Sequence, residues 1–189
     1  MEQIVFATEA DIPAILEIMN SAVEKDTARQ DWYVTDDEAF VRRHITDEGY
    51  TLKYIIDNET VAFLVVRHPG EAEDNLGRYL PEVGQRRGLS AKKCHRAAGI
   101  PENITDLSCV AHMESAAVHL AHRGKGLQGK LLQYAAEIEQ NRGTRFLMAT
   151  VHPDNIYSLG NLERAGYKCI LETEKYGGLR RKVMCRELG

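Results

Sequence analysis

The sequence lacks the features that usually mark a nucleic-acid-binding or metal-binding protein. Its 189 residues contain 24 Lys and Arg against 28 Asp and Glu, which gives a net charge of −4. A general nucleic-acid binder normally carries a basic excess, so no nucleic acid is expected as a partner. The four cysteines are scattered, with no CxxC or Cys/His spacing, so no metal site is expected either. Buried thiols are favoured over disulfides.

Long apolar runs and basic leader-like segments are also missing. Residues 1–6 have no basic flank and no long apolar stretch, so we expect neither a signal peptide nor a membrane-spanning helix. A cytoplasmic protein in a reducing environment is the default expectation. Hydrophobic residues make up 43% and charged residues 28% of the chain. That balance and length predict a single domain over 1–189, with an irregular insertion at about 68–105.

Hydrophobic periodicity predicts an alternation of strands and helices. The order along the chain is β-α-α-β-β, the insertion, and then β-α-β-α-β-β. Strands are expected at 4–7, 50–56, 61–66, 107–120, 145–151, 167–172 and 181–185, and helices at 12–26, 36–45, 126–140 and 155–165. Residues 57–60 have the composition of a hairpin turn.

One glycine-rich stretch carries the strongest chemical signal. Three glycines follow the predicted strand that ends at residue 120, and a helical pattern begins without a break. Arg123, Lys125 and Lys130 add positive charge. The first amides of a helix have no intrahelical partner, and the helix dipole adds positive potential there. The stretch therefore predicts a site for a phosphate-bearing ligand.

Two familiar phosphate-binding motifs fit this stretch poorly. Gly124-Lys-Gly126-Leu-Gln-Gly129 matches the dinucleotide-binding pattern GxGxxG. However, it lies late in the chain, and the strand after it has no acidic residue at its end. A Walker A loop would need Ser or Thr at the position of Leu131 to ligate magnesium.

A third pattern fits more of the chain. Arg123-Gly-Lys-Gly126-Leu-Gln128 resembles the Q/R-x-x-G-x-G/A signature of the GCN5-related N-acetyltransferase (GNAT) superfamily, although Gln128 replaces the final Gly or Ala. Residues 152–167 are similar to the second motif of the family, an asparagine followed by a short helix and Gly-Tyr. The resemblance covers about 2–67 and 106–188, whereas 71–105 have no clear counterpart.

This resemblance implies a fold and a cofactor. The fold would be an α/β (α+β) architecture with a mixed, mostly antiparallel central sheet that is flanked by helices on both faces. The cofactor would be acetyl-CoA. The resemblance implies cofactor-binding roles for Val118 and Leu120 at the pantetheine arm, for Arg123, Gly124, Lys125, Gly126, Leu127, Gln128, Gly129 and Lys130 at the pyrophosphate, and for Asn155 and Ser158.

The same resemblance implies a general base on the strand before the loop. His112 and Glu114 occupy the positions where the family commonly has one, and alternation along a strand would place both on one face. His112 could accept a proton near neutral pH, whereas Glu114 would need a raised pKa or would orient water or the amine. Structural roles remain the alternative for both residues, and the choice between them stays open.

The general acid is not marked. Many family members have a tyrosine seven residues after the motif asparagine, but Leu162 stands there. Tyr157 and Tyr176 are substitutes by chemistry alone, and Tyr157 is our candidate. Water or direct proton transfer would also suffice.

The sequence thus predicts an N-acetyltransferase that acts by direct attack of a primary amine, on a small molecule or a peptide, within a ternary complex. The alternative is a catalytically silent acyl-CoA-binding sensor. Acidic residues near the second helix and at the start of the insertion would favour a cationic amine or polyamine as acceptor, whereas a solvated face would explain the same charges. They are Asp36, Asp37, Glu38, Asp47 and Glu48, and Glu71, Glu73 and Asp74. The last strands offer an edge for a homodimer. The sequence does not identify the acceptor.

Overall fold

The computed structural model describes residues 1–23, 27–80 and 106–189. The chain divides into two compact units, Met1–Arg67 with Met113–Glu137, and His68–His112 with Ile138–Gly189. Seven strands have the order β1-β2-β3-β4-β5-β7-β6. Strand β4 (Val110–Val118) belongs to the second unit up to His112 and to the first unit from Met113. The result is a mixed α/β fold with a mostly antiparallel sheet, as the sequence predicts.

The first unit contains an antiparallel meander and the helices that cover it. Its other strands are β1 (Glu2–Phe6), β2 (Gly49–Ile56) and β3 (Glu59–Arg67), and its helices are α1 (Ile12–Ala22), α2 (Glu38–Thr46) and most of α4 (Leu127–Asn141). Asp57 and Asn58 join β2 to β3 with φ of 48° and 70°. Two consecutive left-handed residues are what a tight hairpin turn requires.

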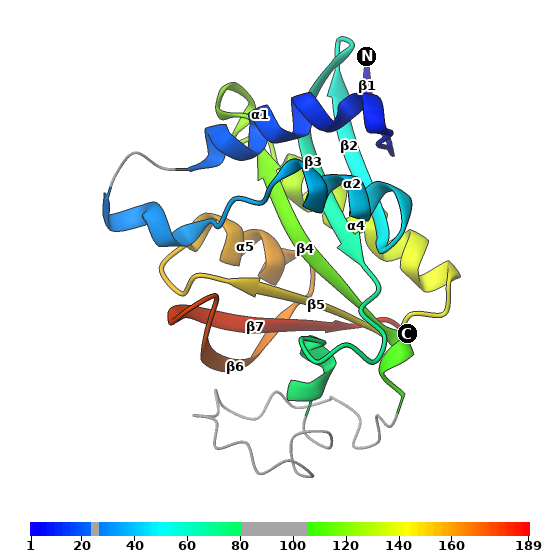
Figure 1. Cartoon of the computed structure of the whole chain (residues 1–189), viewed down its shortest axis with the longest axis vertical. Coiled ribbons are helices and arrows are strands. Elements are labelled where there is room, and N and C mark those ends of the chain that lie inside the picture. The colour runs from blue at the N-terminus through cyan, green and yellow to red at the C-terminus, as the bar shows by residue number, and fades with distance from the viewer. Residues whose placement is uncertain (24–26, 81–105) are drawn as a thin grey trace. The chain divides into compact units, whose positions relative to one another are not determined.

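The two faces of this meander are covered by different helices. Phe63 and Val65 of β3 pack with the apolar faces of α1 and α2 and with Ala117 of β4. Alternation turns Ala62 and Leu64, both almost fully buried, to the opposite face. Figure 1 shows α1 and α2 on one side of β2 and β3 and α4 on the other. Helices therefore lie on both faces of this part of the sheet.

The second unit is built on the remaining strands. It contains β5 (Phe146–Val151), β6 (Lys168–Lys175), β7 (Leu179–Glu187) and helix α5 (Ile156–Arg164). Strand β7 pairs antiparallel with both β5 and β6. The β6–β7 turn contains Tyr176, Gly177 and Gly178, all with positive φ. Its core cluster combines Leu76, Leu80, Val110, Phe146, Met148, Leu171, Val183 and Cys185.

Part of the predicted insertion belongs to this core. We expected residues 71–105 to form a solvated insertion with a short helix or two, or else a substrate lid or specificity loop; the short helix is present, but its side chains are not all solvated. Leu76 and Leu80 are 5% and 0% exposed, and they border a short 3₁₀ helix, Leu76–Tyr79. Asn75 caps this helix by accepting the N–H of Gly77, and its amide donates to the carbonyls of Gly70 and Leu107. The rest of the predicted insertion, 81–105, lies outside the described residues.

Strand β4 is shorter than predicted. The expected strand 107–120 is a strand only over Val110–Val118, and both flanks are 3₁₀ turns. At the far end, the imidazole of His119 accepts the N–H of Ala121, and the His119 carbonyl accepts the N–H of His122. This local capping turns the chain out of the strand, because both polar groups of His119 favour the turn. In the described part of the chain, no helix is long and apolar enough to cross a membrane.

Candidate active site

The glycine-rich stretch forms a turn between β4 and α4 in the first unit. The His119 N–H still pairs with the carbonyl of Val61 at 2.8 Å, and Leu120–His122 then form a 3₁₀ turn. Helix α4 begins at Leu127, and the Lys130 N–H donates to the Gly126 carbonyl at 3.1 Å. The amides of the preceding three residues are those that an α-helix leaves without an intrahelical partner. The N-terminus of α4 therefore lies at the glycines, as predicted.

Two glycines in this turn adopt conformations that L side chains avoid. Gly124 and Gly126 have φ of +79° and +73°. A Cβ atom built on either, or on Gly129, would meet no heavy atom within 4 Å. Packing within the chain therefore does not explain why these positions lack side chains. Glycines with open space in front let a ligand approach the backbone closely, which is what a pyrophosphate needs.

The three cations of this stretch have different surroundings. Arg123 and Lys125 are exposed, and Lys125 Nζ lies 3.3 Å from His122 Nδ1. Lys130 points to the strands instead, where its Nζ donates to Glu2 at 3.2 Å and to the Tyr54 hydroxyl at 3.0 Å. These hydrogen bonds raise the pKa of Lys130. Arg123 and Lys125 thus remain as charges at the turn, whereas Lys130 is neutralised by Glu2.

A second group of polar residues surrounds Glu114 in the first unit. The hydroxyls of Tyr33 and Ser115 are 2.7 Å apart, which links the segment before α2 to β4 next to Glu114. Asp36, three residues after Tyr33, has its pKa raised to about 6 by burial and by the negative charges of Glu114 and Asp37. Asp36 and Glu114 are therefore close enough for the charge of Glu114 to disfavour the ionisation of Asp36. Like charges in one site raise the pKa of a carboxyl in this way.

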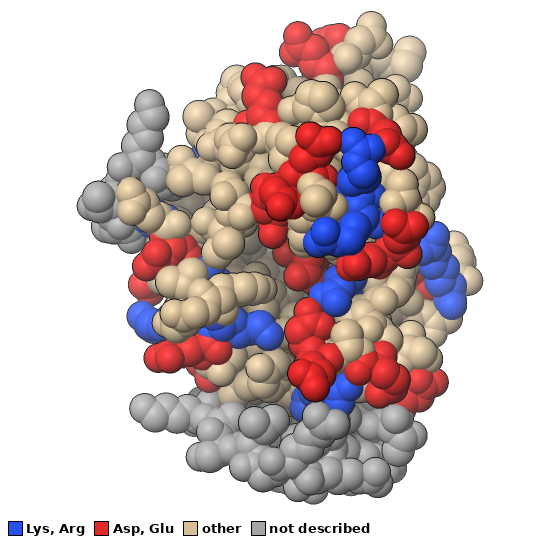
Figure 2. Space-filling model, in the orientation of Figure 1, with Lys and Arg blue, Asp and Glu red and all other residues tan. Residues whose placement is uncertain are grey.

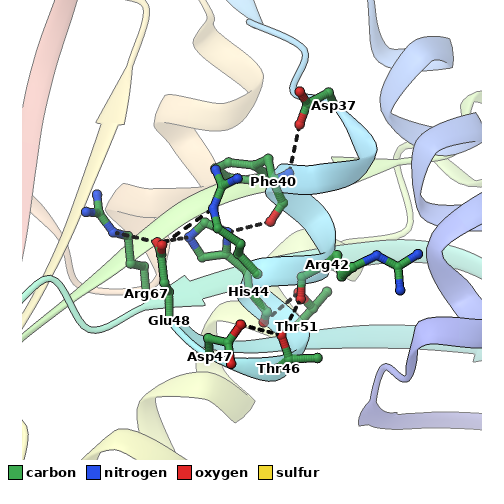
Figure 3. A network of polar contacts seen from close by, with 10 residues as sticks. Asp37, Phe40, Arg42, His44, Thr46, Asp47, Glu48, Thr51 and Arg67 are labelled. Atoms are coloured by element: carbon green, nitrogen blue, oxygen red, sulfur yellow. Dashed lines mark hydrogen bonds and ion pairs between the residues drawn. The ribbon is translucent and has the colours of Figure 1, made fainter.

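The other acidic residues near α2 have local structural partners. Asp37 caps α2 by accepting the Phe40 N–H at 2.8 Å, and Glu38 pairs with Arg42. Figure 3 shows the Glu48 carboxylate facing Arg67 and His44, at 3.7 and 3.6 Å. On the face that carries α1 and α2, acidic and basic side chains are interspersed (Figure 2). Of the five acidic residues near α2, Asp36 is the one whose pKa is raised by the charge of Glu114.

His112 occupies a different environment from Glu114. It lies in the second unit, is 2% exposed, and its Nε2 accepts the backbone N–H of Leu76 at 2.9 Å. An imidazole nitrogen that already accepts a buried N–H is not available to take a proton from a substrate. Of the two candidate bases, the geometry favours Glu114.

The second motif forms the start of α5 in the second unit. Asn155 caps this helix, since its side-chain oxygen accepts the N–H of Ser158 at 3.1 Å. Tyr157 is 66% exposed, whereas Leu162, at the position of the expected tyrosine, is 3% exposed in the core. Tyr176 lies in the β6–β7 turn, where its hydroxyl is 3.1 Å from that of Thr150. The phenols of Tyr157 and Tyr176 are thus both partly exposed to solvent.

A comparison with known protein families identifies the family of this chain. The model of the acetyltransferase (GNAT) family matches residues 13–167. The chain belongs to the GNAT family. That match contains both the glycine turn and the Asn155 motif, and GNAT proteins use acetyl-CoA. No curated protein sequence matches the chain.

Solved GNAT structures share the fold. The ribosomal-protein-S18-alanine N-acetyltransferase of Escherichia coli has a TM-score of 0.68 at 14% identity, and the alignment covers 100% of this chain and 95% of that one. A protein from Salmonella typhimurium assigned as an acetyltransferase, and solved with its cofactor acetyl-CoA, has a TM-score of 0.65 at 21% identity, with 100% and 94% covered. At these identities the likeness establishes the fold alone.

The sequence did not single out the association of Asp36 with Glu114. Asp36 was expected only as one of several acidic residues, because nothing in the local pattern separates it from Asp37 or Glu38. What separates Asp36 is its burial and its interaction with the charge of Glu114, which lies far away in the sequence. The local sequence pattern does not reveal such an interaction between distant segments.

Proposed function

We propose that this protein is an N-acetyltransferase that transfers acetyl from acetyl-CoA to a primary amine of a small molecule or a peptide. Membership of the GNAT family supports acyl transfer, and the fold neighbours include a protein named as an alanine N-acetyltransferase. The reaction proceeds by direct attack within a ternary complex. The alternative of a silent acyl-CoA sensor has no observation in its favour.

The observation that carries this proposal is the pair of left-handed glycines, Gly124 and Gly126, facing open space at the start of α4. Their backbone, the amides of Leu127, Gln128 and Gly129, and the charges of Arg123 and Lys125 would hold the pyrophosphate. Backbone groups of Val118 and Leu120 would hold the pantetheine arm, and Asn155 and Ser158 are proposed contacts from the second unit. When bound, acetyl-CoA supplies an activated acetyl thioester.

Glu114 is proposed as the general base. An acceptor amine arrives protonated near neutral pH and must lose its proton before it can attack a carbonyl carbon. The carboxylate of Glu114 accepts that proton, directly or through a water. Asp36 is a second carboxylate near this base, and the charge of Glu114 contributes, after burial, to the raised pKa of Asp36.

We propose that a solvent-exposed group donates a proton to the coenzyme A thiolate as it leaves. Leu162 lies in the core and has no proton to give. Tyr157 is our proposed donor, because it is exposed in the first turn of α5, two residues from Asn155. Water is the alternative donor.

The family match spans both compact units, which supports a single acetyltransferase domain over 1–189. The described start of the predicted insertion contributes Leu76 and Leu80 to the core of the second unit. The cytoplasmic location and the homodimer stay predictions from the sequence.

The test is a thiol-release assay that follows calorimetry. Acetyl-CoA is titrated into the protein first. Free thiol is then measured with diamines, amino acids, aminoglycosides and peptides with free N-termini as acceptors. We expect saturable binding of acetyl-CoA and acceptor-dependent thiol release with at least one class. If acetyl-CoA does not bind, the proposal is wrong. Binding without release in any class would instead favour the sensor.

A further inference from the structure

Three side chains of the first unit meet on the face of the sheet that α4 covers. Tyr54 of β2 donates its hydroxyl proton to Glu2 of β1 at 2.5 Å. Lys130 of α4 donates to the same hydroxyl at 3.0 Å and to the same Glu2 oxygen, Oε2, at 3.2 Å. We call Glu2, Tyr54 and Lys130 the Lys130 anchor. It joins two strands to the first turn of α4.

The strand register makes this arrangement specific. Tyr54 pairs with Ile4, so Glu2, two residues away on β1, stands on the same face as Tyr54. The Tyr54 ring is 3% exposed, and Lys130 Nζ lies 5.3 Å from its centroid. A buried ring holds its hydroxyl at one place, so the ammonium is directed by a fixed partner rather than by a mobile one. The hydrogen bond from Tyr54 and that from Lys130 lower the pKa of Glu2, in that order.

Lys130 is also part of the loop that we propose to bind the cofactor. Its backbone N–H donates to the carbonyl of Gly126, one of the two left-handed glycines. The side chain of Lys130 therefore binds the strands, while its backbone N–H holds the Gly126 carbonyl in the turn. A movement of the α4 N-terminus away from β1 and β2 would stretch the hydrogen bonds of the anchor.

We propose that Tyr54 and Glu2 are positioning residues for the pyrophosphate loop, which act by holding Lys130 against the sheet. This inference rests on the proposed function of that loop. It gives Lys130 a role different from the direct phosphate contact that the sequence resemblance implies. A preorganised loop loses less conformational entropy when it binds, so the anchor increases cofactor affinity without touching the cofactor.

The two roles of Lys130 predict opposite signs for one substitution. If Lys130 serves as an anchor, Tyr54→Phe loosens the first turn of α4 and weakens binding. If Lys130 instead contacts phosphate, Tyr54→Phe frees its ammonium and tightens binding. Tyr50→Phe is the matched control. Tyr50 is a buried tyrosine on the same face of β2, with its hydroxyl outside the anchor.

The experiment measures coenzyme A affinity by calorimetry in Tyr54→Phe, Lys130→Met, the double variant and Tyr50→Phe. Because each anchor variant removes hydrogen bonds that hold the first turn of α4, each should raise Kd several-fold. The Kd of the double variant should be no higher than that of the single variant that binds more weakly, because both substitutions disrupt the same set of hydrogen bonds. Tyr50→Phe should leave Kd unchanged. Tighter or unchanged binding in Tyr54→Phe, or additive losses in the double variant, would overturn the proposal.

A second measurement separates this inference from the proposed function. Hydrogen exchange is followed in the protein without cofactor at the backbone amides of residues 130–133, which start with the hydrogen bond from Lys130 to Gly126 in the first turn of α4. Faster exchange in Tyr54→Phe, but not in Tyr50→Phe, is expected even if coenzyme A fails to bind the unmodified protein. That result would support the structural role of the Lys130 anchor and contradict the proposal that the loop binds coenzyme A. If coenzyme A binds normally and neither exchange nor affinity responds to Tyr54→Phe, the anchor proposal is wrong.

Discussion

The Nε2 atom of His112 accepts the backbone N–H of Leu76 at 2.9 Å, on a ring that is 2% exposed. The lone pair that would make His112 a base is therefore used to hold the 3₁₀ helix that begins at Leu76. Glu114 lies two residues further along β4, and its charge contributes to the raised pKa of Asp36. The same strand thus carries a structural histidine and a candidate catalytic carboxylate.

Substitutions at His112 and Glu114 should therefore differ in kind. Glu114→Gln should lower kcat about 100-fold or more, because a general base contributes factors of this size. His112→Ala should cost about 2–4 kcal/mol of unfolding free energy, since it leaves the Leu76 N–H without its acceptor and opens a cavity. Urea unfolding and pH–rate profiles of both variants test this. Loss of the acidic limb of the profile in His112→Ala, with Glu114→Gln unaffected, would reverse the assignment.

Asp36 should make stability depend on pH. Its pKa is about 6 in the folded protein, because of burial and the charges of Glu114 and Asp37, and about 3.9 when unfolded. The folded state therefore binds this proton more tightly, so its contribution to stability is present below about pH 4 and is lost as the pH rises through 6. Asp36→Asn removes that loss. Because Asp36 is partly exposed, screening limits the expected gain at pH 7.5 to about 1 kcal/mol.

Urea unfolding of Asp36→Asn and the unmodified protein across pH 4–8 measures this difference. The two curves should converge at pH 4 and separate as the pH rises. Glu38→Gln, which removes an exposed carboxylate paired with Arg42, serves as the control and should show no such separation. A constant difference between Asp36→Asn and the unmodified protein at all pH values would show that the pKa of Asp36 is not raised in the folded protein.

Gly126 and Gly143 offer a matched pair for the loop. Both have positive φ, of +73° and +82°, and a Cβ on either meets no atom within 4 Å. Replacement by alanine should thus cost each a similar backbone strain of about 1 kcal/mol. In Gly126→Ala the methyl group also faces the proposed pyrophosphate, so Kd for acetyl-CoA should rise about 10-fold or more. Gly143→Ala should leave Kd unchanged. Equal affinities, measured by calorimetry, would remove the turn from the cofactor site.

Leu76 tests whether the start of the predicted insertion is structural. Its side chain is 5% exposed and packs in the cluster with Phe146 and Val183. Leu76→Ala should lower the free energy of unfolding by about 2–4 kcal/mol, as truncation of a buried leucine commonly does. The backbone N–H to His112 is retained in this variant. A loss below 0.5 kcal/mol in urea unfolding, about that of an ordinary surface change, would show that this segment is dispensable for the core.

Much of the fold was predictable because the strands and helices of this chain have clear periodicity. The hairpin between β2 and β3 follows from Asp57 and Asn58, and the start of α4 follows from Gly124 and Gly126. The ends of β4 were not predictable. His119 closes the strand with its own side chain and carbonyl, and the apolar alternation continues to Leu120 regardless.

The candidate site was predictable only where the residues are near one another in the sequence. The glycine turn follows from the local sequence pattern, and the candidate base positions on β4 come from the resemblance to the GNAT family. The choice between His112 and Glu114 depends on Leu76, and the environment of Glu114 depends on Tyr33 and Asp36. The partner of Lys130 is Glu2, 128 residues away. Such contacts are set by the packing of distant segments, which local pattern does not encode.

Mass spectrometry of acceptor amines after incubation with acetyl-CoA tests the central claim most directly. The account predicts that one amine gains a single acetyl group on nitrogen, in amounts equal to the thiol released, and that Glu114→Gln nearly abolishes both. The contradicting result is thiol release at the same rate with and without acceptors, or the absence of any acetylated amine although acetyl-CoA binds.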